Sequence, residues 1–254
     1  MMKKIILRCE DSTNKRDNKL GVYFQGWLLH QLPNEVATAL HESIIKPYTI
    51  SVKQKNGMAE FIVTVLKDDL IQEVDNVLLS DGLNAIYLTS SKQKEFMIKE
   101  RVVKVLTEKD LSQTFYQVDA VKKYGLEFYT STSFKVDGEY HFFPDLRLIY
   151  QSLMRKYNVI FENNNHVDQD LLNELVAKTK IVSYRVQSTY YPIHKSFIPG
   201  FTGTIKVSCF GNQTLANYLN MLLRFGSYAG VGIKTSMGMG AIEYQEIKKG
   251  DRHG

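Results

Sequence analysis

The chain has 254 residues, of which 44% are hydrophobic and 11% aromatic, enough for one large core or two ordinary ones, and this excludes a disordered chain. Lys and Arg number 32 against 27 Asp and Glu, and the net charge of +5 is compatible with a polyanionic partner without requiring one. The two cysteines, Cys9 and Cys209, lie in apolar runs without CxxC spacing, which excludes a disulfide framework and a zinc site and predicts buried, reduced thiols.

The amino-terminal residues show no pattern typical of a targeting signal. Only three apolar residues directly precede Arg8, too few for the hydrophobic region of a signal peptide. No later segment approaches 18 uninterrupted apolar residues. We therefore expect a cytoplasmic protein that does not enter a membrane.

The first 107 residues predict the order strand, helix, strand, strand, helix, strand. Apolar residues at helical spacing indicate a helix that Pro33 ends and a second short helix that Asn34 caps. A further helix begins at Asp68 or Asp69, and a turn at 56–57 between two alternating segments indicates a β-hairpin. The expected strands are residues 3–9, 47–53, 59–67, 84–90 and 96–107.

The polar segment 108–113 is interpreted as a boundary, after which a similar order begins again. Two amphipathic helices are expected, one over 144–158 and one capped by Asn212. The expected strands of this half are residues 126–136, 139–143, 181–191, 203–210 and 241–247. The pattern predicts an α+β protein of two tandem ferredoxin-like (RRM-like) domains, 1–112 and 113–254, with the helices on one face of each antiparallel sheet.

A glycine-rich segment, GVGIKTSMGMG, occupies residues 230–240 near the carboxyl end. It fails the Rossmann spacing because Thr235 stands at the third glycine position, and it follows a helix instead of opening one. No register gives the P-loop spacing. Glycines without side chains, one lysine and two hydroxyls suit contact with a phosphodiester backbone. The alternative, which the spacing leaves open, is a turn that packs closely on a neighbouring helix.

Four segments together resemble a known family: FQGWLLH with LHESIIKPYTIS, FPDLRLIYQSLMRKYN, FIPGFTGTIKVSC, and LLRFGSYAGVGIKTSMGMGAIE. They are similar to the CRISPR repeat-processing endoribonucleases of the RAMP superfamily, whose carboxyl-terminal loop has the pattern G-x-G-x5-G-x-G. The resemblance runs from about residue 7 to residue 243. It implies two ferredoxin-like folds and a metal-independent ribonuclease without cofactors, which cuts precursor RNA within the repeat and leaves 2′,3′-cyclic phosphate and 5′-OH ends.

The resemblance also implies which residues carry out the reaction. His41 stands at the position of the family's catalytic histidine, and a histidine side chain can act as acid or base near neutral pH. Lys46 matches a basic position near the scissile phosphate. The alternative is an ordinary lysine at the carboxyl end of a helix, where the helix dipole favours a cation. Leu29 stands where relatives often have a tyrosine. His30 is the candidate substitute, with Tyr23 a weaker one, and which histidine is acid and which is base stays open.

The RNA-binding prediction covers the loop and a basic, aromatic segment before it. In the latter, cations alternate with Tyr184, Tyr190 and Tyr191, which suits phosphate contacts combined with base stacking. About half of these side chains are expected to serve the fold instead. The predicted RNA-binding residues are Gly230, Gly232, Lys234, Thr235, Ser236, Gly238, Gly240, Arg224, Arg185, His194 and Lys195.

Two other functions were compared with the catalytic one. A non-catalytic RNA-binding subunit of a CRISPR effector complex would share the fold and the loop but has no need of His41. A metal nuclease is disfavoured because acidic residues do not cluster with histidines at ligand spacing. The implied partner is CRISPR repeat RNA and not DNA. A monomer or a homodimer, and association with other effector proteins, are left open.

Overall fold

The structure, a computed structural model, describes residues 1–11, 17–43, 45–89, 93–118, 121–193 and 196–248. Its residues form two compact units that are interleaved in the sequence. The N-terminal unit comprises Met1–Leu106, Tyr191–Ile198 and Lys234–Met239, and the C-terminal unit comprises Thr107–Tyr190, Pro199–Ile233 and the residues from Gly240 onward. The domain bounds of 1–112 and 113–254 stay a prediction.

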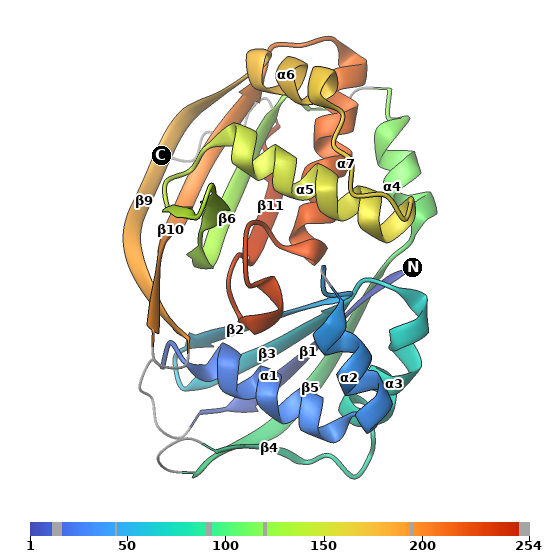
Figure 1. The fold of residues 1–254 in the computed structure, drawn as a ribbon, viewed down its shortest axis with the longest axis vertical. Helices are drawn as coiled ribbons and strands as arrows, with labels where there is room; N and C mark the ends of the chain where they lie inside the picture. The colour runs from blue at the N-terminus through green and yellow to red at the C-terminus, as the bar shows by residue number, and fades with distance from the viewer. Residues whose placement is uncertain (12–16, 44, 90–92, 119–120, 194–195, 249–254) are drawn as a thin grey trace. The chain divides into compact units, whose positions relative to one another are not determined.

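The N-terminal unit is built on an antiparallel sheet in the order β2-β3-β1-β5-β4. With β5 as the fourth strand, the first four have the ferredoxin-like order, and β4 extends the edge. Helices α1, α2 and α3 cover one face of this sheet (Figure 1). The elements are β1 (Met2–Glu10), α1 (Leu20–Gln31), α2 (Asn34–Glu42), β2 (Tyr48–Lys55), β3 (Met58–Val65), η1 (Asp68–Leu70), α3 (Ile71–Leu78), β4 (Ala85–Thr89) and β5 (Gln93–Leu106).

The core of this unit follows from the two-residue period of its central strand. Ile5, Leu7 and Cys9 alternate along β1, are fully buried and pack in one cluster with Phe24 and Leu28 of α1. At the typical value of roughly 25 cal/mol per Å² of buried apolar surface, each such large side chain contributes about 1.5–3 kcal/mol. This packing fixes α1 on the sheet.

The C-terminal unit repeats the arrangement with a four-stranded sheet in the order β11-β6-β10-β9. This is again the ferredoxin-like order, so the predicted fold class is confirmed. Figure 1 shows α5 and α7 on one face of the sheet. The elements are α4 (Glu108–Phe115), β6 (Lys123–Thr132), β7 (Phe134–Val136), β8 (Glu139–His141), α5 (Leu146–Phe161), α6 (Gln169–Ala177), β9 (Thr179–Ile193), β10 (Ser196–Cys209), α7 (Gln213–Ala229) and β11 (Ile242–Glu246).

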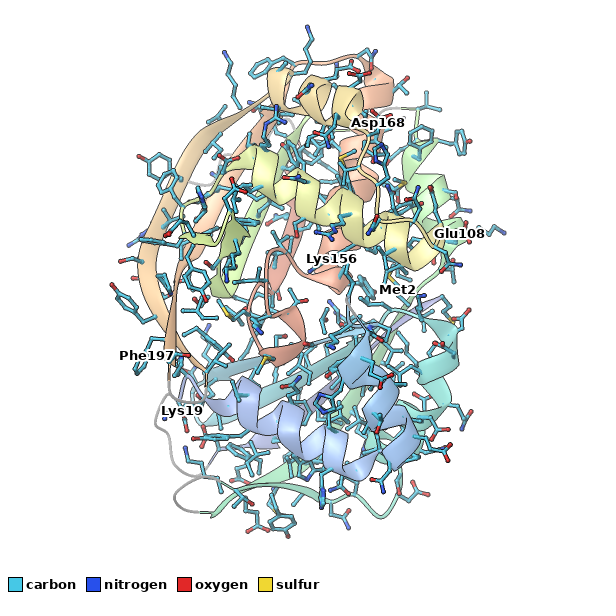
Figure 2. The ribbon with its side chains drawn as sticks, in the orientation of Figure 1. Met2, Lys19, Glu108, Lys156, Asp168 and Phe197 are labelled. Carbon is cyan, nitrogen blue, oxygen red and sulfur yellow. The ribbon has the colours of Figure 1, made fainter. Side chains whose placement is uncertain are left out.

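Two short helices, α4 and α6, were not predicted. The segment interpreted as a boundary is the helix α4, which Thr107 and Asp110 start with a capping box. Asp168, labelled in Figure 2, starts α6 by accepting hydrogen bonds of 3.0 Å from the amides of Asp170 and Leu171. Both helices are short, so their caps are clearer signals than the spacing of their apolar residues.

Three smaller predictions were wrong in detail. The single strand expected over 126–136 is divided, because β6 ends at Thr132 and β7 pairs only with β8 in a separate two-stranded sheet. The strand expected over 139–143 ends at His141. The cap of α2 is Pro33, and Asn34 is its first helical residue.

Candidate active site and RNA-binding loop

His41 and Lys46 are held together at the carboxyl end of α2. His41 lies in the last turn of this helix with its side chain exposed, and of the α2 residues only Leu40 is buried. The ammonium of Lys46 donates hydrogen bonds of 2.7 Å to the carbonyls of His41 and Ser43. The lysine thus closes the helix, which favours a cation there, and fixes its own position relative to the histidine.

Lys46 also lies beside a second cation, Lys234 at the tip of the glycine-rich loop. Partial burial lowers the pKa of Lys46, and repulsion from the Lys234 ammonium lowers it further. Both residues belong to the N-terminal unit, and the Lys234 side chain is exposed. Two neighbouring ammonium groups form a site that favours an anion such as a phosphate.

The loop tip, Lys234–Met239, contains the short helix η2 (Thr235–Met237), which packs against β2 and α1. The Tyr191 hydroxyl donates a hydrogen bond of 2.7 Å to the carbonyl of Met237. A Cβ added to Gly21 on α1 would lie 2.9 Å from the Cα of Gly238, so both positions need glycine for this close approach. A further hydrogen bond joins the side chains of Ser236 and Tyr48, the first residue of β2.

The segments on either side of the loop tip are held within the C-terminal unit; the first leg is Gly230–Gly232 and the second leg is Gly240 with Ala241. The amide of Val231 donates to the carbonyl of Gly240 at 2.7 Å, and the amide of Gly240 donates to the carbonyl of Ser131 at 2.9 Å. A Cβ at Gly232 would lie 2.2 Å from the Ser133 carbonyl oxygen. Close packing on a neighbouring helix is therefore confirmed at Gly238, which approaches α1, whereas the close contact of Gly232 is with Ser133 between β6 and β7.

All four glycines of the loop pattern have positive φ: 64° at Gly230, 77° at Gly232, 101° at Gly238 and 69° at Gly240. L-residues with a Cβ adopt this region only at a cost, which glycine avoids. Lys234 also has a positive φ of 56°. The loop sequence thus specifies a backbone that is bent at five positions in eleven residues.

The remaining predicted catalytic positions lie on α1. His30 is exposed near the end of this helix. Leu29 and Tyr23 are half-buried and pack against the core of the N-terminal unit. His30 is therefore free of the core, as a group that contacts substrate must be, whereas Leu29 and Tyr23 on the same helix serve packing.

The other predicted RNA-binding side chains have different surroundings. The Arg224 guanidinium donates to the Asp110 carbonyl at 3.1 Å and to the Thr114 hydroxyl at 2.6 Å, which joins α7 to α4. Arg185 is exposed on β9. Thr235 is half-buried and Ser236 is buried. His194 and Lys195 lie outside the described residues.

The tyrosines of the same segment divide into two groups. Tyr184 and Tyr190 are 64% and 68% exposed on β9, and the ring of Tyr184 meets that of Phe143 edge-on at 6.3 Å. Tyr191 is only 6% exposed and bonds to the loop tip. Exposed rings are available for base stacking, whereas Tyr191 positions the loop.

Sequence reasoning missed the residues that support the loop. Gly21, Ser152 and Lys156 were not predicted as functional, although each lies in a segment expected to be helical or near a helix end. A glycine at the start of a helix is a weak signal by itself. Only the fold shows which distant segment approaches it.

Comparison with known proteins identifies the family. The family model for the CRISPR-associated endoribonuclease Cas6 matches residues 126–242. A CRISPR-associated endoribonuclease Cas6 of Streptococcus thermophilus is 34% identical over 232 residues, which cover 90% of this chain and 93% of that relative. The chain belongs to the Cas6 family. A Cas6 endoribonuclease of Mycobacterium tuberculosis (strain CDC 1551 / Oshkosh) is 30% identical over 229 residues, 90% of this chain and 72% of the relative.

Solved Cas6 structures share the fold. The Cas6 (TTHB231) product complex has a TM-score of 0.76 at 20% identity and covers 96% of this chain and 100% of its own. Thermus thermophilus Cas6 (TTHB231) has a TM-score of 0.71 at 21% identity, with 96% and 98% covered. At such identities the similarity shows the Cas6 fold and leaves the site residues to the geometry above.

Within the described ranges, no three or more His, Cys, Asp or Glu side chains are grouped so that they could hold a metal ion. No helix in this part of the chain combines the length and the apolar character needed to cross a membrane.

Proposed function

We propose that this protein is a metal-independent endoribonuclease that cuts CRISPR precursor RNA within each repeat and thereby releases guide RNAs. Membership of the Cas6 family supports an endoribonuclease. The observation that carries the proposal is the arrangement at the end of α2. There an exposed His41 lies next to Lys46, and Lys46 lies beside Lys234 of the glycine-rich loop.

The proposed reaction is an internal transesterification. A base takes the proton of the 2′-OH upstream of the scissile phosphate, and the 2′-oxygen forms a bond to phosphorus. The bond from phosphorus to the 5′-oxygen breaks, and an acid protonates that oxygen. The products are a 2′,3′-cyclic phosphate and a 5′-OH. The nucleophile belongs to the RNA, so no protein nucleophile, metal or cofactor is needed.

The residues take separate roles in this scheme. His41 transfers a proton as base or acid, and exposed His30 is the candidate for the opposite role. Lys46 and Lys234 stabilise the negative charge that develops on the phosphorane, an effect that commonly contributes about 2.7–4 kcal/mol per donor. A lysine with a lowered pKa keeps this role as long as it is protonated.

The proposed partner is the repeat RNA. The loop residues from Gly230 to Gly240 contact its backbone, and the contact is extended by Arg185, Arg224, His194, Lys195 and the exposed Tyr184. DNA is bound at best and not cut, because it lacks the 2′-OH. We propose that the protein works in the cytoplasm as a monomer or homodimer, either alone or with other CRISPR effector proteins.

A single 2′-deoxy nucleotide tests the reaction. Repeat RNA with 2′-deoxy at the nucleotide upstream of the cut should bind like all-ribose RNA and remain uncut, since the nucleophile is missing. RNA with the deoxy substitution one nucleotide further upstream is the matched control and should be cut. Cleavage of the first RNA would overturn the proposal. Binding without cleavage of all-ribose RNA would favour a non-catalytic RNA-binding subunit.

A further inference from the structure

Helix α5 holds the first leg of the glycine-rich loop through two side chains one helical turn apart. The amide of Gly232 donates a hydrogen bond of 2.9 Å to the Ser152 hydroxyl oxygen. The ammonium of Lys156 donates to the carbonyls of Ala229 and Gly230, each at 3.0 Å. Residues four apart lie on the same face of a helix, so α5 presents an acceptor and a donor to the same short segment.

The surroundings of Lys156 are unusual for a lysine. Its side chain is only 8% exposed, on the buried side of α5 that also carries Leu153 (Figure 2 labels Lys156). Burial of an ammonium disfavours the charged form, and here it lowers the pKa of Lys156 to about 7. A methionine of similar length would fill the space without that cost. The benefit of an amino group at this position therefore lies in the hydrogen bonds that it donates.

The two carbonyls that Lys156 bonds, those of Ala229 and Gly230, are the last before the loop. Helix α7 ends at Ala229, and Gly230, with φ 64°, turns the chain out of the helix. Both residues are buried, so their carbonyls are poorly placed to bond water. The carboxyl end of a helix also favours a positive charge. Lys156 satisfies these carbonyls and thereby fixes the direction in which the loop leaves α7.

The second leg is held by other groups. The amide of Gly240 bonds to the carbonyl of Ser131, and the amide of Ala241 donates 2.8 Å to the hydroxyl of Thr130. One backbone bond, from Val231 to Gly240, joins the two legs. The bonds from Ser152 and Lys156 of α5 all go to the first leg. Loss of the Lys156 amino group should therefore release one leg while the other stays in place.

We propose that Lys156, acting with Ser152, is a positioning residue for the glycine-rich loop. It holds the first leg so that the backbone amides of this leg are fixed before RNA arrives, and RNA binding then loses less conformational entropy. The inference rests on the proposed function in one respect, namely that the loop contacts the RNA backbone. The fixing of the loop itself can be measured without RNA.

The test compares Lys156→Met with Arg155→Met. Arg155 is the exposed neighbour on the same helix, so both variants replace a basic side chain of α5 by methionine, one at a buried position and one at the surface. In Lys156→Met, amide hydrogen exchange at Val231 and Gly232 should speed up about tenfold or more, while exchange in β1 stays unchanged. Ser152→Ala should speed up the exchange of Gly232 in the same direction. Arg155→Met should match the wild type.

Repeat RNA supplies the second readout. Lys156→Met should weaken RNA affinity about tenfold relative to Arg155→Met, with a smaller loss in the single-turnover cleavage rate at saturating protein. An affinity within twofold of Arg155→Met, or unchanged exchange in the first leg, would overturn the proposal. If the wild-type protein neither binds nor cuts repeat RNA, the proposed function fails, and the exchange measurement still decides whether Lys156 positions the loop.

Discussion

At the scale of single residues, His41 carries the strongest expectation. It is exposed in the last turn of α2, so its replacement removes no core packing. His41→Ala should lower the single-turnover cleavage rate about 10²- to 10⁴-fold, the usual contribution of general acid–base catalysis, with RNA affinity within about twofold. The neighbouring exposed Glu42→Ala is the control and should cleave normally. A matching loss of affinity in His41→Ala would contradict a catalytic role.

Lys234 should act through charge. Lys234→Gln removes one exposed cation from the loop tip, so RNA affinity should fall and its dependence on salt should weaken by about one phosphate contact. Lys109→Gln on α4 removes the same charge from another exposed position and serves as the comparison. Fluorescence titrations at several salt concentrations give the slope. An identical slope for the wild type and Lys234→Gln would show that the loop tip does not contact phosphate.

Lys156 predicts how stability changes with pH. Its pKa is about 7 in the folded protein against an ordinary 10.5, so between these values the unfolded chain binds a proton that the folded chain does not. The free energy of unfolding therefore rises with pH across this window, by up to about 1.4 kcal/mol per pH unit, and the gain is lost as pH falls through about 7.

Urea unfolding of the wild type and Lys156→Met at pH 7, 8 and 9 measures this term. The wild type should gain stability relative to the variant as pH rises, because the variant has no group to titrate there. Arg155→Met should follow the wild type. A difference between wild type and Lys156→Met that is the same at all three pH values would show that Lys156 keeps its ordinary pKa.

At the scale of elements, glycines in different surroundings should respond in opposite ways. Gly26 lies in α1, and an added Cβ would meet no atom within 4 Å, so Gly26→Ala should stabilise the protein by about 0.5–1 kcal/mol. Gly232→Ala would place a Cβ 2.2 Å from the Ser133 carbonyl oxygen at a φ of 77°. Thermal melting should show a lower midpoint, and repeat RNA should bind more weakly. Wild-type behaviour of Gly232→Ala would contradict the described loop.

The elements also show what the sequence could predict. Long apolar periods and hairpin signals gave the ferredoxin-like order in both units, because one buried face forces a regular pattern. The helices α4 and α6 escaped because each spans only eight or nine residues, too few for its apolar residues to establish a clear helical period. Glycine spacing singled out the loop, but the approach of Gly238 to Gly21 joins segments more than 200 residues apart, and no local pattern encodes it.

At the scale of the whole molecule, the units are interleaved. The loop tip, Lys234–Met239, and the segment Tyr191–Ile198 belong to the N-terminal unit, although the chain on either side of them belongs to the other unit. The N-terminal unit therefore contains both His41 and Lys234. Residues from opposite ends of the sequence thus meet in one unit, and this is the arrangement on which the proposed active site rests.

The central claim is that RNA is cut by 2′-OH attack without a metal. Single-turnover cleavage of repeat RNA in excess EDTA, with the product ends identified by mass spectrometry, tests it most directly. We predict that the rate in EDTA equals the rate in magnesium and that the upstream product carries a 2′,3′-cyclic phosphate. Inactivity in EDTA that magnesium restores, or a 3′-OH on the upstream product, would contradict the account.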